Sequence, residues 1–189
     1  MLSKIKRHHI ILLFLLGLIS VVGIIIWKDD QSEGQKLIIR PFNQKSDLVP
    51  LSTLINANKF MLSENNNFPT EKFLLWRAPN FDPARKGQAH IDVIEVDGVP
   101  AGFVSFYRKS TSAGYVWLLA VDKHFRGQGL GQKLMEHALG QLKQQGARFV
   151  TLTTRTINTQ ALKLYLKLGF VEKSRDEERG IVFLTKENL

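Results

Sequence analysis

Apolar residues recur along this chain with two different periods, and the period separates helices from strands. Between residues 130 and 145 they recur at steps of four, which predicts an amphipathic helix over residues 131–145. The residues of this apolar stripe are Leu130, Leu134, Ala138 and Leu142. We expect the stripe to face the core of a folded domain.

Shorter apolar runs, some of them alternating with polar residues, predict strands. Asp97 and Gly98 separate two of these runs and are a strong signal for a two-residue hairpin. The predicted strands are residues 36–40, 89–96, 101–107, 115–121, 148–154, 170–173 and 181–185, and the other predicted helices are 47–58, 68–77 and 158–167. This order predicts an α/β (α+β) fold in one domain over residues 36–189, which is long enough to bury a core.

The N-terminal segment differs from the rest of the chain. Residues 10–27 carry no charged side chain and follow a basic flank, residues 1–9. An apolar stretch of this length nearly spans a bilayer, so we predict an uncleaved, single-pass transmembrane anchor, followed by a polar linker over residues 28–35. A signal peptide and a buried helix are the alternatives. Lysine and arginine flank both ends in similar numbers, so the sequence does not set the orientation.

Composition excludes several kinds of site. There is no cysteine, which rules out disulfides, a thiol nucleophile and cysteine-bound zinc, and the five histidines lack metal-ligand spacing. We therefore predict no metal. The formal net charge of +9 suits an anionic ligand, an anionic lipid surface or nucleic acid, and equally a merely solubilising surface. Lysine and arginine form no aromatic-interleaved patch, so we place nucleic-acid binding last.

A glycine-rich turn, residues 126–131, lies between the predicted strand 115–121 and the helix 131–145. Gly127, Gly129 and Gly131 allow a tight turn and a close approach of the backbone to a ligand. The N-terminus of the following helix presents unpaired N–H groups and the positive end of its dipole. This combination predicts a cradle for an anion, best suited to a diphosphate. The alternative is a turn that only lets the strand and helix pack.

Two motifs on these elements resemble those of the GNAT superfamily of N-acetyltransferases. The first is Leu118-Leu119-Ala120-Val121 running into Arg126-x-x-Gly129-x-Gly131. The second is Asn158-x-x-Ala161-x-x-x-Tyr165-x-x-x-Gly169-Phe170. The resemblance covers nearly all of residues 36–189. It implies a mixed, mostly antiparallel sheet flanked by helices, and acetyl-CoA as the co-substrate.

The resemblance also implies the site residues. Backbone groups of the strand would pair with the pantetheine, the turn would hold the diphosphate, and Tyr165 would protonate the departing thiolate. The implied cofactor-binding residues are Leu119, Ala120, Val121, Arg126, Gly127, Gln128, Gly129, Leu130, Gly131, Gln132 and Asn158. Alternatively, Tyr165 is a half-buried aromatic on an amphipathic helix, and Asn158 is only a helix N-cap.

The sequence departs from the family at two places. Lys123 stands where many members carry proline, which should affect the stiffness of the loop more than the chemistry. The strand 115–121 contains no glutamate or histidine that could act as a general base. Other possible bases are Asp92, His90, Tyr107 and His124, and a bound-water relay would also serve, so we name no base.

The predicted function is therefore transfer of an acetyl group from acetyl-CoA to a primary amine by direct attack. The alternative is a non-catalytic, membrane-tethered acyl-CoA-binding module. In this fold the acceptor would lie between residues 56–70 and 174–179, and a protein terminus, a lysine, an aminolipid or a small amine would fit the chemistry. Because acetyl-CoA is cytosolic, we expect a membrane protein whose catalytic domain faces the cytosol.

Overall fold

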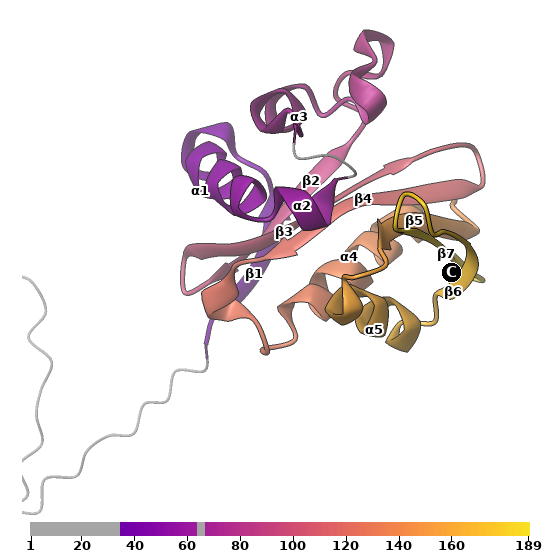
Figure 1. Cartoon of the computed structure of the whole chain (residues 1–189). Coiled ribbons are helices and arrows are strands. Elements are labelled where there is room, and N and C mark those ends of the chain that lie inside the picture. Colours follow the sequence, from indigo (N-terminus) through magenta and orange to yellow (C-terminus); the bar gives the residue numbers. More distant parts are fainter. Residues whose placement is uncertain (1–34, 64–66) are drawn as a thin grey trace, which may run out of the picture. The chain divides into compact units, whose positions relative to one another are not determined.

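The computed structural model describes residues 35–63 and 67–189 (Figure 1). The predicted anchor at residues 10–27 lies outside the described residues, as do the basic flank and almost all of the linker. Within the described part of the chain, no helix is both long and apolar enough to cross a membrane.

The described residues form one seven-stranded sheet with the order β1-β2-β3-β4-β5-β7-β6. All neighbouring strands are antiparallel except β4 and β5, which are parallel. The strands are β1 (Leu37–Pro41), β2 (His90–Val96), β3 (Val99–Arg108), β4 (Ala113–Val121), β5 (Phe149–Arg155), β6 (Val171–Asp176) and β7 (Ile181–Glu187). The predicted fold class, a mixed and mostly antiparallel sheet flanked by helices, is confirmed.

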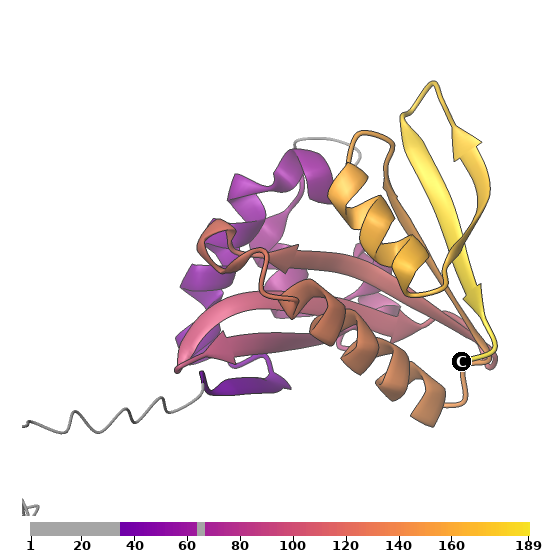
Figure 2. The same ribbon diagram turned by 90° about the horizontal axis from the view of Figure 1, so that it is seen from below.

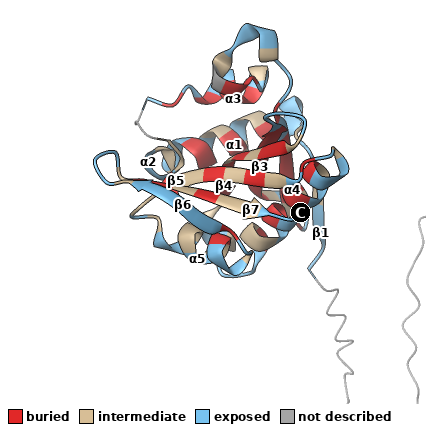
Figure 3. Ribbon diagram, turned by 90° about the vertical axis from the view of Figure 1, so that its right-hand side faces the viewer, coloured by how far each residue is buried: buried red, intermediate tan, exposed pale blue. Residues whose placement is uncertain are grey.

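Helices cover both faces of this sheet. Figure 1 shows α1 (Gln44–Ala57), α2 (Lys59–Leu62) and α3 (Thr70–Trp76) on one face, and α4 (Leu130–Gln144) and α5 (Thr159–Lys167) on the other. Each face has its own apolar core, and the predicted stripe of α4 is buried in the second of them. Figure 3 shows this burial concentrated on the central strands, whereas β6 at the sheet edge is exposed.

The first helix begins earlier than predicted, and the cause is a cap. The sequence pattern places its start at Asp47, whereas α1 begins at Gln44 because the Asn43 side chain accepts a hydrogen bond from the Lys45 N–H at 2.9 Å. The Asn43 N–H in turn donates to the Asp47 carboxylate at 2.7 Å. Two further boundaries are also wrong: α3 is shorter than residues 68–77, and β6 continues to Asp176 where a turn was predicted.

Asp47 is fully buried and fastens α1 to the sheet. Its carboxylate accepts hydrogen bonds from Arg40 at 2.6 and 2.8 Å, and Arg40 also pairs with Glu95 on β2. Burial alone would raise the pKa of Asp47, but the hydrogen bonds from Arg40, Asn43 and Ser46 outweigh it and lower that pKa. The ionised carboxylate is therefore part of the folded state.

We expect Asp47→Ala to reduce the free energy of unfolding by about 1.5–3 kcal/mol, because it removes charge-assisted hydrogen bonds from a buried site. Urea denaturation at neutral pH measures this loss. Since the folded-state pKa of Asp47 is lowered, its contribution is present above about pH 4 and disappears as the pH falls further. Equal stability of variant and wild type at pH 7 would contradict this role.

A divergence between β4 and β5 opens the sheet at its centre. The two strands pair only from Ala113 with Phe149 to Tyr115 with Thr151, near the start of each strand. Beyond this point they separate, and Figure 2 shows β5 leaving β4 together with the β6–β7 hairpin. The gap lies directly before the predicted glycine turn, so it decides where a ligand can enter.

Candidate functional site

A β-bulge in β4 changes the face of the sheet on which the side chains of the strand's second half lie. Ser105 of β3 pairs with Leu118 while the adjacent Phe106 pairs with Val116, so Trp117 is the extra residue. One extra residue moves each of the following side chains to the opposite face of the sheet from the one it would occupy in regular pairing. Accordingly, Val116 packs in the core beneath α4, whereas Leu118 packs in the core beneath α1 and α3.

The backbone of β4 beyond the bulge is directed into the gap. Asp122 N–H donates to Ala101 O at 2.8 Å, which identifies that pair as hydrogen-bonded across β3 and β4. Antiparallel pairing alternates, so the N–H and C=O groups of Leu119 and Val121 point away from β3. With β5 already diverging, they point into the gap, where an extended ligand with amide groups can pair with them.

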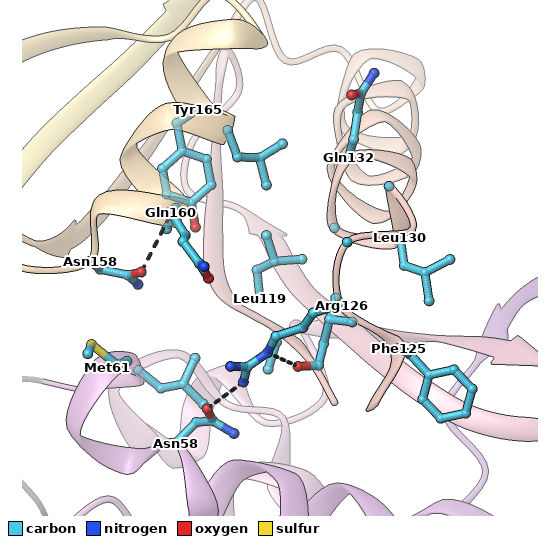
Figure 4. Close-up of a pocket in the computed structure, with 18 of the residues that line it drawn as sticks. Asn58, Met61, Leu119, Phe125, Arg126, Leu130, Gln132, Asn158, Gln160 and Tyr165 are labelled. Carbon is cyan, nitrogen blue, oxygen red and sulfur yellow. Dashed lines mark hydrogen bonds between the residues drawn. The ribbon is translucent and has the colours of Figure 1, made fainter. Parts of the chain in front are cut away.

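The larger of the two pockets that we describe, about 410 Å³, lies at this gap (Figure 4). Its walls come from β4, the glycine turn and the start of α4, one side of α5 along its length, and α2. The structure brings every predicted site residue to this pocket except Gln128, which is exposed on the turn. The predicted residues that line it are Leu119, Ala120, Val121, Arg126, Gly127, Gly129, Leu130, Gly131, Gln132, Asn158 and Tyr165.

The glycine turn has the geometry of an anion cradle. Gly127 and Gly129 adopt φ values of +80° and +76°, in the left-handed region that glycine enters most easily. Gly129 is the N-cap of α4, and no side chain caps this helix end. The first N–H groups of α4 therefore remain available at the pocket, with the positive end of the helix dipole behind them.

Arg126 is fixed at the rim of the pocket. Its Nε donates to Val121 O at 3.0 Å and its Nη2 donates to the Asn58 side-chain oxygen at 3.0 Å (Figure 4). The guanidinium therefore holds positive charge beside the cradle and also connects the turn to the start of α2. Asn58 was not expected here, because nothing in a local window of sequence relates it to Arg126.

Tyr165 and Asn158 enter the pocket from α5. Tyr165 is only 6% exposed, its ring lies 5.9 Å from that of Phe170, and it projects toward the same space as Leu119 and Gln160 (Figure 4). Burial, and secondarily the phenol of Tyr115, raise the pKa of Tyr165 above its ordinary value. Asn158 caps α5 through Ala161 N at 3.4 Å and also lines the pocket, so it is both an N-cap and a pocket residue.

A second pocket of about 220 Å³ is lined by residues on both sides of the same divergence. Its described lining offers hydroxyl groups, including Tyr115 and Thr153, whose oxygens are 3.2 Å apart, but no carboxylate or imidazole. The lining residues are Met61, Leu62, Ser63, Phe68, Tyr115, Trp117, Thr153, Thr154, Arg155 and Ile181. The first predicted acceptor region, residues 56–70, contributes four of these, and residues 174–179 contribute none.

None of the four possible bases lines either of these pockets. Asp92 is paired with His137 at 2.6 Å, and His90 stacks on a phenylalanine. The His124 side chain is 74% exposed beside Asp122. Burial raises the pKa of Tyr107 to about 12. These positions do not suit proton abstraction from a bound acceptor.

Acidic, histidine and cysteine side chains do not gather into a metal site in the described part of the chain. No group of three or more of them lies close enough to hold an ion there. The larger pocket instead offers backbone amides, the fixed guanidinium of Arg126 and the buried phenol of Tyr165.

Comparison with known proteins agrees with this geometry. The chain matches the model of the Acetyltransferase (GNAT) family over residues 55–170. N-alpha-acetyltransferase 30 of Schizosaccharomyces pombe is 38% identical over 69 residues, which are 36% of this chain and 46% of that protein. The chain thus matches less than half the length of this relative.

Solved structures share the fold. One is yncA from Salmonella typhimurium with its cofactor acetyl-CoA, with a TM-score of 0.67 and 18% identity over 80% of this chain and 94% of that one. Another is the NatC complex bound to Gag peptide and CoA, with a TM-score of 0.61 and 22% identity over 82% of this chain and 99% of that one. At these identities the likeness establishes the architecture.

Proposed function

The chain belongs to the acetyltransferase (GNAT) family, and on that premise we propose that it is an acetyl-CoA-dependent N-acetyltransferase. The single observation that carries the proposal is the larger pocket, where the exposed backbone of β4, the glycine cradle and Tyr165 meet. Acetyl-CoA has a part to match each of these: pantetheine amides for the backbone of β4, a diphosphate for the cradle and a thioester for Tyr165, with the pantetheine joining the diphosphate to the thioester.

Each part of the co-substrate has a group to receive it. The backbone of Leu119 and Val121 pairs with the pantetheine, and the first N–H groups of α4 hold the diphosphate, with Arg126 adding positive charge. In this orientation the thioester reaches the region between β4 and α5. Tyr165 lies there.

The reaction is a direct transfer. The neutral amine nitrogen attacks the thioester carbonyl carbon, the carbon–sulfur bond breaks, and an amide and coenzyme A result. Backbone N–H groups steady the oxyanion of the tetrahedral intermediate. Tyr165 donates its proton to the departing thiolate, and its raised pKa keeps the phenol protonated for this step. The amine's proton leaves to water, and the Tyr165 phenolate takes a proton back from water, which restores the phenol for the next turnover.

Turnover tests this function against the alternative of a non-catalytic acyl-CoA-binding module. Release of coenzyme A with a panel of amines, above the rate of hydrolysis in water, would support the enzyme. Binding of acetyl-CoA with no release above hydrolysis for any amine would favour the binding module.

We expect the acceptor's kcat/KM to rise with pH at a slope near one and to level off near the amine's own pKa, about 7.7–8.0 for an α-amino group. The described lining of the second pocket offers no carboxylate or imidazole to take the amine's proton. No fall is expected on the basic side below about pH 10, because burial raises the pKa of Tyr165. A steady-state pH profile checks both limbs, and a plateau already at pH 6 would contradict the absence of an enzyme base.

A protein N-terminus is the acceptor that we favour. The second pocket lies beside the proposed thioester position, because Met61 and Leu62 line both pockets. An extended peptide can enter it with its α-amine leading. The similarity to N-alpha-acetyltransferase 30, whose name states this type of substrate, supports the choice. A panel of peptides compared with lysine side chains, aminolipids and small amines tests it.

We propose further that residues 10–27 anchor the protein in a membrane by a single span, with the acetyltransferase domain facing the cytosol, where acetyl-CoA is found. The uncharged, apolar character of this stretch supports the anchor. Protease protection in sealed vesicles tests the orientation, and turnover with and without residues 1–35 tests whether the anchor selects the acceptor. A domain outside the cytosol would count against acetyl-CoA as the donor.

A further inference from the structure

Helix α2 forms a wall that the two pockets share. It is only four residues long, and Met61 and Leu62 line the larger pocket on one side and the smaller pocket on the other. None of its residues is buried, and so short a helix has little stability of its own. Contacts with other elements must therefore set its position.

Arg155 of β5 holds the C-terminal end of α2. Its Nε and Nη2 both donate to the carbonyl oxygen of Ser63, at 3.2 and 3.0 Å. The guanidinium carbon lies 4.6 Å from the centre of the Phe60 ring, a cation–π contact. Arg155 thus connects β5 to α2 on the side where the smaller pocket lies, and its side chain is part of the lining of that pocket.

Arg126 holds the other end of α2. It donates to the side chain of Asn58, the residue immediately before the helix, at 3.0 Å. Arg126 belongs to the glycine turn at the larger pocket, and Arg155 belongs to β5 at the smaller pocket. The N-terminal end of α2 is therefore held from the side of the larger pocket, and its C-terminal end is held from the side of the smaller pocket, the proposed acceptor site.

We infer that Arg155 is a positioning residue for the acceptor: by fixing the Ser63 carbonyl and the Phe60 ring, it sets the wall formed by Met61 and Leu62. The inference rests on the proposed function only in assigning the smaller pocket to the acceptor. Arg155 does not line the larger pocket, and Arg126 still holds the Asn58 end of α2, so the loss of Arg155 should disturb acceptor binding more than acetyl-CoA binding.

Steady-state kinetics of the full chain tests this inference with the best substrate from a peptide panel that varies the first residue. We expect Arg155→Ala to raise the peptide's KM about tenfold, with kcat within about twofold of wild type, because it removes two charge-assisted hydrogen bonds and a ring contact. The dissociation constant for acetyl-CoA, measured by calorimetry, should rise much less than the peptide's KM, because Arg126 still holds the other end of α2. Arg155→Lys keeps the charge and one donor but loses the planar fork, so it should recover part of the loss.

Arg148→Ala is the control, because Arg148 is an arginine next to β5 that is exposed and lines neither pocket, whereas Arg155 is half-buried and lines the smaller one. It should leave all three constants at their wild-type values. An unchanged peptide KM in Arg155→Ala, or an equal rise in Arg148→Ala, would overturn the inference. If Arg155→Ala fails to fold, the lysine variant decides the question by the same constants.

Hydrogen exchange separates failure of this inference from failure of the proposed function. The backbone amides of residues 59–63 should exchange faster in Arg155→Ala and Arg155→Lys than in wild type, and Arg148→Ala should match wild type. Unchanged exchange in the Arg155 variants would overturn the positioning role even if no peptide is acetylated. Absence of wild-type turnover with every peptide, together with faster exchange, would reject the acceptor assignment but uphold the role of Arg155 in fixing α2.

Discussion

Replacing Gly129 by glutamate should weaken acetyl-CoA binding by at least about 100-fold. Gly129 is the N-cap of α4 with φ +76°, and a Cβ added there would meet no protein atom within 4 Å beyond its chain neighbours. The added carboxylate would therefore occupy ligand space and set a negative charge against the diphosphate, at the helix end that favours anions. Left-handed strain adds about 1–2 kcal/mol to the cost of the variant.

Calorimetry of acetyl-CoA into the purified protein measures this loss. Gly146→Glu is a close control, because Gly146 follows the other end of α4, has φ +90° and also has no atom within 4 Å of an added Cβ. It carries the same backbone strain and the same charge away from the pocket. If both variants lost binding equally, the effect would be one of folding, and if neither did, the cradle would not hold the diphosphate.

Tyr165→Phe should lower kcat about 100- to 1000-fold, while KM for acetyl-CoA stays near its wild-type value. The variant keeps the ring that packs against Phe170 and removes only the hydroxyl, which is the proposed proton donor to the thiolate. General acid catalysis by a positioned side chain commonly contributes about 10²–10⁴-fold. The loss should therefore fall on the chemical step.

Single-turnover kinetics with a peptide acceptor measures that step. Tyr107→Phe serves as the control, since Tyr107 is another buried tyrosine whose pKa is raised by burial but which lines neither pocket. Its rate should stay within about twofold of wild type. An undiminished rate in Tyr165→Phe would leave Tyr165 as a packing residue and assign protonation of the thiolate to water.

The sequence alone determined the features that depend on neighbouring residues. The four-residue spacing of the α4 stripe requires one buried face, and all four predicted residues are buried. Asp97 and Gly98 form the hairpin turn with φ values of +51° and +81°. The glycine turn and the Asn158 cap likewise depend on backbone freedom and capping within a few residues, so the local pattern was sufficient to place them.

Only the tertiary structure decided how distant segments meet, because no local pattern records such contacts. Asp47 lies buried in α1 because Arg40 on β1 pairs with it and with Glu95 on β2. The bulge at Trp117 depends on pairing with β3, and it turns β4 toward both pockets. Arg155 meets Ser63 across 92 residues of chain, so the wall of the second pocket arises from packing between the predicted strand β5 and a short helix, α2, that the sequence pattern did not predict.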